Sequence, residues 1–176
     1  MVLLLDKSGS VQGYESEIVR FAHQCIDQFV LGNHSANVGV IVFDGRAKTI
    51  ASLTDDGQLL RSQVRDFVGG GAKACLPAPP HHHWRPCHFT TIPHCPYAGP
   101  TSISAALLAA ADMLRTGRTG VRKFVLLLSD GRQSPLHGGD KVAIATAAAV
   151  RANQSLLSDS GSPLQVQALC SLAHWR

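Results

Sequence analysis

The feature that most constrains the fold of this chain is a set of short apolar runs, each of which ends in a polar loop. The runs cover residues 2–5, 38–43 and 124–128. Strands that are buried on both faces read as continuous apolar runs of this length, whereas half-exposed strands alternate. Segments with helical periodicity separate the runs, and alternating strands and helices form a mainly parallel sheet covered on both faces. We therefore predict an α/β fold with a doubly wound sheet and helices on both of its faces.

Four segments have apolar residues at the spacing of an amphipathic helix. They are residues 14–31, a segment that begins after Asp55 or Asp56, a segment that begins near Thr101, and the alanine-rich residues 140–153. Either aspartate can cap the second helix, because its side chain accepts hydrogen bonds from amides of the first turn. The pattern therefore places a helix in most of the connections between strands.

One connection between strands is predicted to be a tight turn. Asp44 and Gly45 form a dipeptide typical of β-hairpins, and residues 47–53 can form the second strand. We expect this strand to run antiparallel to residues 38–43 at one edge of the sheet. Residues 164–169 predict one more strand late in the sequence.

Length and composition limit the classes of protein that remain open. A chain of 176 residues with 45% hydrophobic content suits one domain, residues 1–176, with a sizeable core. The net charge of +4 comes from scattered Lys and Arg residues without a basic run, so no nucleic-acid partner is expected. No segment approaches the ~20 apolar residues that span a bilayer, so no membrane contact is expected. Five cysteines, an odd number, indicate no paired disulfide framework.

Residues 72–99 interrupt the periodic pattern. This segment is rich in Pro, His and Cys and has neither helical nor strand periodicity, which is unusual for a loop of this length inside a compact domain. Its Cys and His residues permit a zinc site, but no C-x-x-C pair or finger-like spacing supports one. We interpret the segment as an insert, and we expect its deletion to leave the fold intact.

Residues with hard oxygen atoms follow two of the apolar runs and precede one helix. Asp6, Ser8 and Ser10 follow the first run, Asp130 follows the third, and Thr101 stands where a helix is predicted to begin. Ligands of open α/β sheets bind outside the carboxyl ends of the strands, so we expect these loops to meet there. Carboxylates, hydroxyls and waters are a donor set that suits Mg²⁺. Each of these segments alone is also explained as an ordinary turn, because Ser-Gly-Ser and Asp-Gly sequences form loops without a metal.

The segments D-K-S-G-S, T-S-I-S-A-A-L and L-L-L-S-D-G, in this order, resemble the sequence pieces of the metal-ion-dependent adhesion site of von Willebrand factor type A and integrin I domains. The resemblance covers nearly the whole chain and implies the Rossmann-like von Willebrand A fold. It implies binding of Mg²⁺ or Mn²⁺, with an open coordination position for a Glu or Asp of a protein partner. Lys7 falls at a variable position of the motif and is expected to be a solvated surface cation. The metal-site residues that the resemblance implies, some direct and some through water, are Asp6, Ser8, Ser10, Thr101 and Asp130.

The resemblance also implies a non-enzymatic, adhesion-type binding module, and many relatives are extracellular or at the cell surface. An intracellular type A domain that serves as an assembly platform in a multiprotein complex is the alternative. A metal-dependent hydrolase is a third reading, but no His or Glu is identifiably placed beside the three loops as a general base. Family members continue past the fifth strand with a helix, a strand and a last helix, so we expect this chain to be truncated at its C-terminus.

Overall fold

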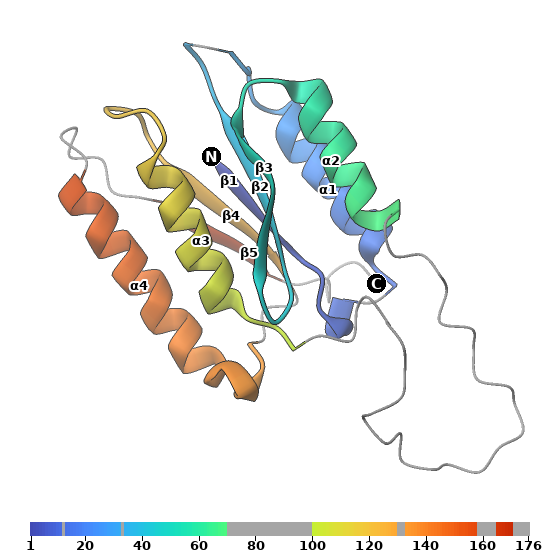
Figure 1. Cartoon of the computed structure of the whole chain (residues 1–176), viewed down its shortest axis with the longest axis vertical. Helices are drawn as coiled ribbons and strands as arrows, with labels where there is room; N and C mark the ends of the chain where they lie inside the picture. Colours follow the sequence, from blue (N-terminus) through green and yellow to red (C-terminus); the bar gives the residue numbers. More distant parts are fainter. Residues whose placement is uncertain (12, 33, 70–99, 130–132, 158–164, 171–176) are drawn as a thin grey trace, which may run out of the picture.

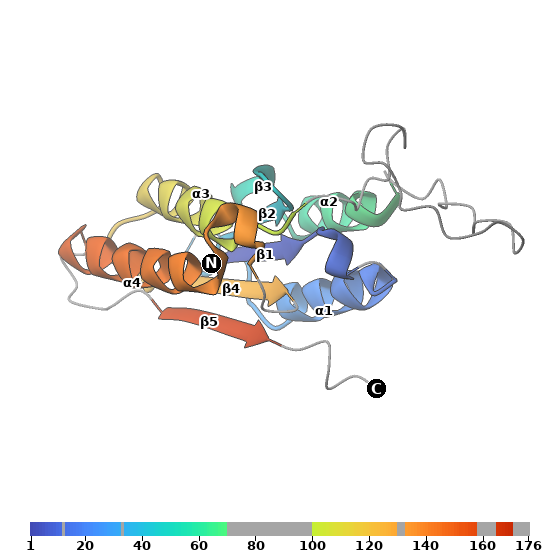
Figure 2. The ribbon, with the colours of Figure 1, turned by 90° about the horizontal axis from the view of Figure 1, so that it is seen from below.

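The computed structural model describes residues 1–11, 13–32, 34–69, 100–129, 133–157 and 165–170. Within these residues one sheet has five strands in the order β3-β2-β1-β4-β5. Figure 2 shows this order from β3 to β5, with β1 in the middle. The strands are β1 (Val2–Asp6), β2 (Val38–Phe43), β3 (Ala47–Thr54), β4 (Phe124–Ser129) and β5 (Gln165–Cys170).

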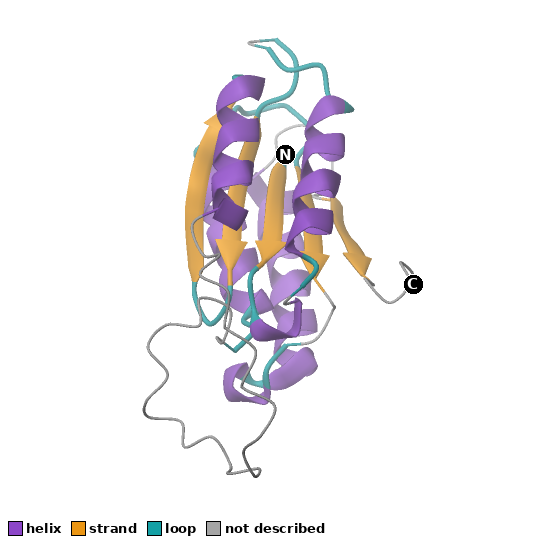
Figure 3. Cartoon of the chain, turned by 90° about the vertical axis from the view of Figure 1, so that its right-hand side faces the viewer, coloured by secondary structure: helices purple, strands orange, loops and turns teal. Residues whose placement is uncertain are grey.

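The sheet is parallel except at one edge. β1 pairs in parallel with β2 and β4, and β4 pairs in parallel with β5. β2 and β3 pair antiparallel across the turn at Asp44, whose carboxylate accepts a hydrogen bond from the amide of Arg46 at 2.9 Å. The predicted antiparallel edge strand is therefore confirmed, and the arrowheads of the parallel strands meet at one end of the molecule (Figure 3).

In the part of the chain that the structure describes, four helices cover the two faces of the sheet, as the periodicity predicted. α1 and α2 lie on one side and α3 and α4 on the other (Figure 1). Short 3₁₀ turns, η1 (Gly9–Val11) and η2 (Pro135–His137), follow β1 and precede α4. The fold is therefore the expected doubly wound α/β architecture. The helices are α1 (Glu15–Asp27), α2 (Gly57–Gly69), α3 (Ile103–Arg115) and α4 (Gly139–Leu157).

The central strand β1 supplies both halves of the hydrophobic core. Leu3 and Leu5 pack in the half that lies under α1 and α2, whereas Val2 and Leu4 pack in the half under α3 and α4. All four side chains are fully buried, because alternate residues of a strand point to opposite faces. The continuous apolar run therefore reflects burial on both sides of the sheet.

One helix start and one helix end show how far the local pattern predicts the bounds of helices. Asp56 caps α2 as predicted, since its Oδ1 accepts hydrogen bonds from the amides of Gln58 and Leu59 at 2.9 and 3.0 Å. The predicted extension of α1 to residue 31 is wrong, because the helix ends at Asp27. The chain turns back after this point, and Val30 is 78% exposed. Apolar residues beyond the end of the helix therefore do not all face the core.

Some expectations concern parts of the chain that the structure does not describe. Residues 72–99, with the proposed insert and its Cys and His residues, lie outside the described residues, and so does Asp130. Of the helices in the described segments, none is both long and apolar enough to cross a lipid bilayer.

Candidate metal centre

The carboxylate of Asp6 lies at the carboxyl end of the central strand and is held from two sides. Asp6 is fully buried as the last residue of β1. Its Oδ1 accepts a hydrogen bond from the amide of Ser8 at 2.8 Å, and its Oδ2 accepts one from the hydroxyl of Ser129 at 2.5 Å. Because Ser129 is the last residue of the neighbouring strand β4, the ends of β1 and β4 are joined through this carboxylate.

The two serine hydroxyls of the first loop point toward each other. Ser8 Oγ and Ser10 Oγ are 2.9 Å apart and share a hydrogen bond. Ser8 is fully buried, whereas Ser10 is exposed. The tight turn η1 brings them together, with the amide of Val11 donating to the carbonyl of Ser8 at 3.3 Å and the Val11 side chain buried in the core. The loop therefore presents one carboxylate and two hydroxyls within five residues of sequence, from residue 6 to residue 10.

A second loop brings Thr101 to the same edge of the sheet. The amide of Ser102 donates to the carbonyl of Asp44 at 2.7 Å, and the amide of Lys7 donates to the carbonyl of Phe43 at 2.7 Å. Both loops are thus tied to the end of β2. Thr101 is 7% exposed and is followed by Ser102, whose side chain caps α3 by accepting a hydrogen bond from the Ala105 amide.

Gln133 joins the start of α3 to the segment before α4. It is 4% exposed. Its Oε1 accepts hydrogen bonds from the amide and the hydroxyl of Ser104, both at 2.8 Å, while its Nε2 donates to the carbonyls of His137 and Gly139 at 2.7 and 2.9 Å. Its own amide donates to the Asp140 carboxylate at 2.8 Å. Every polar group of this buried amide side chain therefore has a partner, which stabilises the loops around Thr101.

The structure brings together four of the five residues that the sequence singled out at this edge of the sheet. Asp6, Ser8 and Ser10 share one loop, and Thr101 lies in the next. Asp130 follows Ser129 directly in the sequence and lies outside the described residues. In the described segments, no three His, Cys, Asp or Glu side chains are grouped so that they could hold a metal ion. Of the four described site residues, Asp6 supplies a carboxylate and the other three supply hydroxyls.

Sequence reasoning missed two residues that organise these loops. Ser129 donates to the buried carboxylate of Asp6, and Gln133 holds the loop before η2. A signal for Ser129 was present, since a hydroxyl residue directly follows the apolar run of β4. Gln133 carries no comparable signal, because its role depends on backbone carbonyls that only the folded loop brings within reach.

Comparisons with known proteins agree with this architecture. Residues 1–74 match the family model described as "von Willebrand factor type A domain". No curated protein sequence matches the chain significantly. Among solved structures, BatB from Bacteroides thetaiotaomicron has a TM-score of 0.64 at 19% identity, covering 96% of this chain and 64% of that one. The chain therefore spans less than two thirds of that protein's length.

Two further structures similar to this chain were solved with a metal ion. Manganese-loaded TRAP from Plasmodium vivax has a TM-score of 0.65 at 19% identity, with 99% of this chain and 58% of that chain covered. Proximal thread matrix protein 1 from the mussel byssus, with a zinc-occupied MIDAS motif, has a TM-score of 0.60 at 18% identity, with 95% and 36% covered. At these identities the likeness establishes the fold alone. The first 74 residues match the family's model, and the strand order and helices agree with these structures, so this chain has the fold of a von Willebrand factor type A domain.

Proposed function

We propose that this chain is a cation-dependent protein-binding module of the adhesion type. In this proposal Mg²⁺ or Mn²⁺ is held by Asp6, Ser8 and Ser10 from the first loop, with Thr101 and Asp130 from the neighbouring loops. The observation that carries the proposal is the pair of hydroxyls 2.9 Å apart beside a fully buried carboxylate at the end of the central strand. An acidic side chain of a protein partner is the expected ligand.

The donor set of the described residues fits a hard divalent cation. The carboxylate of Asp6 and the hydroxyls of Ser8, Ser10 and Thr101 are oxygen donors, which Mg²⁺ and Mn²⁺ prefer, whereas soft thiolate ligands are absent from these loops. Turn chemistry alone explains the Ser-Gly-Ser sequence, but it gives no reason to bury Ser8 and Asp6 completely. Burial of such polar groups is costly unless they have partners, and a cation would be one further partner.

Each residue has a distinct role in this proposal. Asp6 supplies negative charge and is oriented by the Ser8 amide and the Ser129 hydroxyl. Ser10 is exposed, so its hydroxyl is accessible from solvent. A bound divalent cation would supply the electrophilic character that attracts a carboxylate of the partner. We therefore expect recognition of a Glu or Asp side chain and no catalysis by this chain.

A metal titration of the folded protein tests the site directly. An ion that binds only the folded state at 100 times its Kd stabilises by about 2.7 kcal/mol, which for a domain of this size raises the midpoint of thermal unfolding by roughly 5–11 °C. We expect this shift with magnesium or manganese in the millimolar range, and a smaller one with calcium, which prefers more ligands at longer distances. Titration calorimetry should give a saturable heat with the same order of cations.

Variants separate a metal site from a general effect of charge. Asp6→Ala and Asp130→Ala each remove a carboxylate and should abolish the cation-dependent shift, whereas Lys7→Ala should retain it. Asp112→Ala is the matched control, since it removes an exposed carboxylate near the end of α3 that is opposite to Thr101. Equal responses of Asp6→Ala and Asp112→Ala to magnesium, or no heat from either cation with folded wild-type protein, would contradict the proposed site.

A peptide selection tests the partner chemistry. A random peptide library is selected on immobilised protein once with magnesium and once with EDTA. We expect peptides enriched only in magnesium to contain a Glu or Asp, and exchange of that acid for Gln or Asn should abolish their binding. Enrichment of the same peptides in EDTA would show that the chain binds its partners without a cation.

A further inference from the structure

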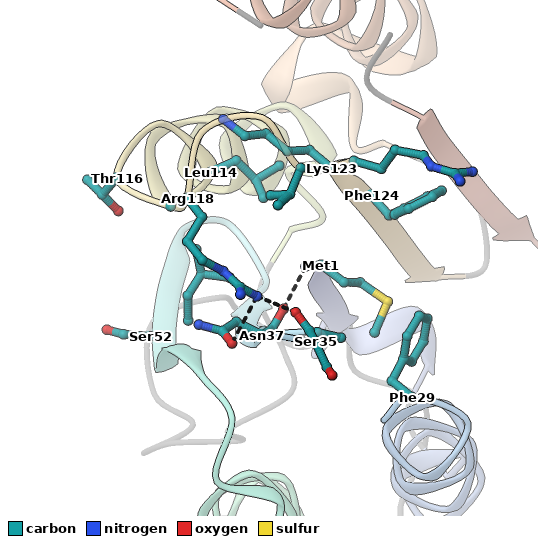
Figure 4. Close-up of a pocket in the computed structure, with 15 residues that line it drawn as sticks. Met1, Phe29, Ser35, Asn37, Ser52, Leu114, Thr116, Arg118, Lys123 and Phe124 are labelled. Atoms are coloured by element: carbon teal, nitrogen blue, oxygen red, sulfur yellow. Dashed lines mark hydrogen bonds between the residues drawn. The ribbon is translucent and has the colours of Figure 1, made fainter. Parts of the chain in front are cut away.

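A pocket lies at the opposite end of the sheet from the loops of Asp6 and Thr101. It has a volume of about 350 Å³ and is lined where β1 and β4 begin, where β3 ends and where α1 and α3 end. Figure 4 shows Met1 at its centre, with Phe124 and Leu114 above and Phe29 to one side. Small-molecule sites in proteins have volumes of about 300–1,000 Å³, so the space suits a small organic ligand.

The charged residues of this pocket are all basic. Arg118, Arg122 and Lys123 line it, and no Asp or Glu is among its lining residues. The pocket therefore has a positive electrostatic potential, which favours an anion.

Arg118 is fixed at the mouth of the pocket. Its guanidinium donates to the carbonyl of Ser35 and to Oδ1 of Asn37, the latter at 3.3 Å, which joins the loop after α3 to the loop before β2. Figure 4 shows this guanidinium between the end of α3 and the Ser35 loop. A guanidinium keeps its charge in proteins, so Arg118 contributes positive potential at the mouth of the pocket while it also makes further interactions within the protein.

The rest of the lining is largely apolar. The side chains of Phe29, Leu53, Leu114 and Phe124 contribute to it, and Leu114 is only 2% exposed, as part of the core under α3. Phe29 is 37% exposed, although it is a large aromatic side chain. An apolar lining beside several cations fits a ligand that has an apolar body and one anionic head.

We propose that this pocket binds a small organic carboxylate with an apolar body, whose head lies between Arg118 and Lys123 and whose body covers Phe29 and Phe124. A medium-chain fatty acid or an arylalkanoic acid has this chemistry. The site is independent of the proposed cation site, because it is built from the opposite ends of the strands. Its ligand therefore requires no divalent cation.

Octanoate is the probe for this proposal. Octanol, which lacks the carboxylate, and acetate, which lacks the long apolar chain, are the two control ligands. We expect saturable octanoate binding to the full chain by calorimetry, with octanol and acetate at least tenfold weaker, since each lacks one of the two recognition elements. In nuclear magnetic resonance spectra, octanoate should shift the amides of Ser52, Thr116 and Gly117, which line the pocket, and leave those of Ser8 and Ser10 unchanged.

A matched pair of lysine variants tests the role of charge. Lys123→Gln removes a cation from the pocket and should weaken octanoate binding about threefold to tenfold, the effect of one charge at a partly exposed site. Lys141→Gln removes an exposed lysine of α4 outside the pocket and should not change it. Asp6→Ala should retain octanoate binding in full, which separates this proposal from the cation site.

Three outcomes would overturn the proposal. They are the absence of saturable octanoate binding up to about 10 mM, which is weaker than ordinary specific affinities, equal affinities of octanoate and octanol, and equal affinities of Lys123→Gln and Lys141→Gln. Arg118→Gln is left as a secondary variant, because it also removes the hydrogen bonds to Ser35 and Asn37.

Discussion

Removal of one hydroxyl beside Asp6 should destabilise the whole domain. Ser129→Ala deletes the donor that lies 2.5 Å from Oδ2 of a fully buried carboxylate. A hydrogen bond to a charged group contributes about 1.5–3 kcal/mol, and its loss leaves a buried acceptor with one partner fewer. For a chain of 176 residues, each kcal/mol lowers the midpoint by about 2–4 °C, so we expect a decrease of roughly 3–12 °C.

The assay compares two serine-to-alanine changes in the same sheet. Ser52 also lies in a strand, β3, but its side chain is exposed. Ser52→Ala should therefore change the free energy of unfolding by no more than about 0.5 kcal/mol. Urea denaturation followed by circular dichroism, without added metal, measures both values and shows from the slope whether unfolding remains two-state.

The same variant also probes the proposed cation site. Loss of a group that orients a metal ligand typically weakens metal binding by about 10–100-fold, so Ser129→Ala should require correspondingly more magnesium for the same stabilisation. If Ser129→Ala is as stable as Ser52→Ala, the hydrogen bond to Asp6 contributes nothing measurable and the reasoning is refuted. If it is less stable but binds magnesium normally, Asp6 has a structural role without a role in metal binding.

Three further predictions follow from single features of the chain. Leu60→Ala should cost about 2–5 kcal/mol in urea denaturation, because it leaves a cavity in the core under α2. Gly138→Ala should cost about 1 kcal/mol or more, since the residue has a φ of +84° and a new Cβ would lie 2.5 Å from the Val142 side chain; unchanged stability would show that η2 relaxes freely. Deletion of residues 72–99 should leave the cooperative unfolding transition in place, and loss of that transition would contradict the interpretation as an insert.

Much of the fold could be predicted because burial has a simple local signature. The runs of β1, β2 and β4 are apolar on both faces, and Asp56 stands at the cap position of α2, where its carboxylate accepts a hydrogen bond from the Gln58 amide. The strand order could not be read from local pattern, since apolar strands of this kind can pair with any neighbour.

The candidate site was predictable to a smaller extent. Asp6, Ser8 and Ser10 are close in sequence, so their proximity follows from one tight turn. Ser129 and Gln133 act through contacts between segments far apart in the sequence, and such contacts have no local signature. The predicted end of α1 was wrong for a related reason, because the residues after Asp27 enter a loop in which the amide of Ala36 donates to the carbonyl of Val30, a contact that helical periodicity does not reveal.

The buried carboxylate of Asp6 also affects the alignment of the sheet. β1 pairs Leu5 with Leu128 of β4, and the residues before them are apolar on both strands and both faces. A slip of one residue would exchange leucines for leucines and cost little hydrophobic energy, although slippage normally carries a large penalty in strands with one polar face. Asp6 favours the native alignment, because this alignment places its carboxylate beside the Ser129 hydroxyl. The residue proposed to hold a cation therefore also helps to specify the register between β1 and β4, together with the pairing of β1 with β2.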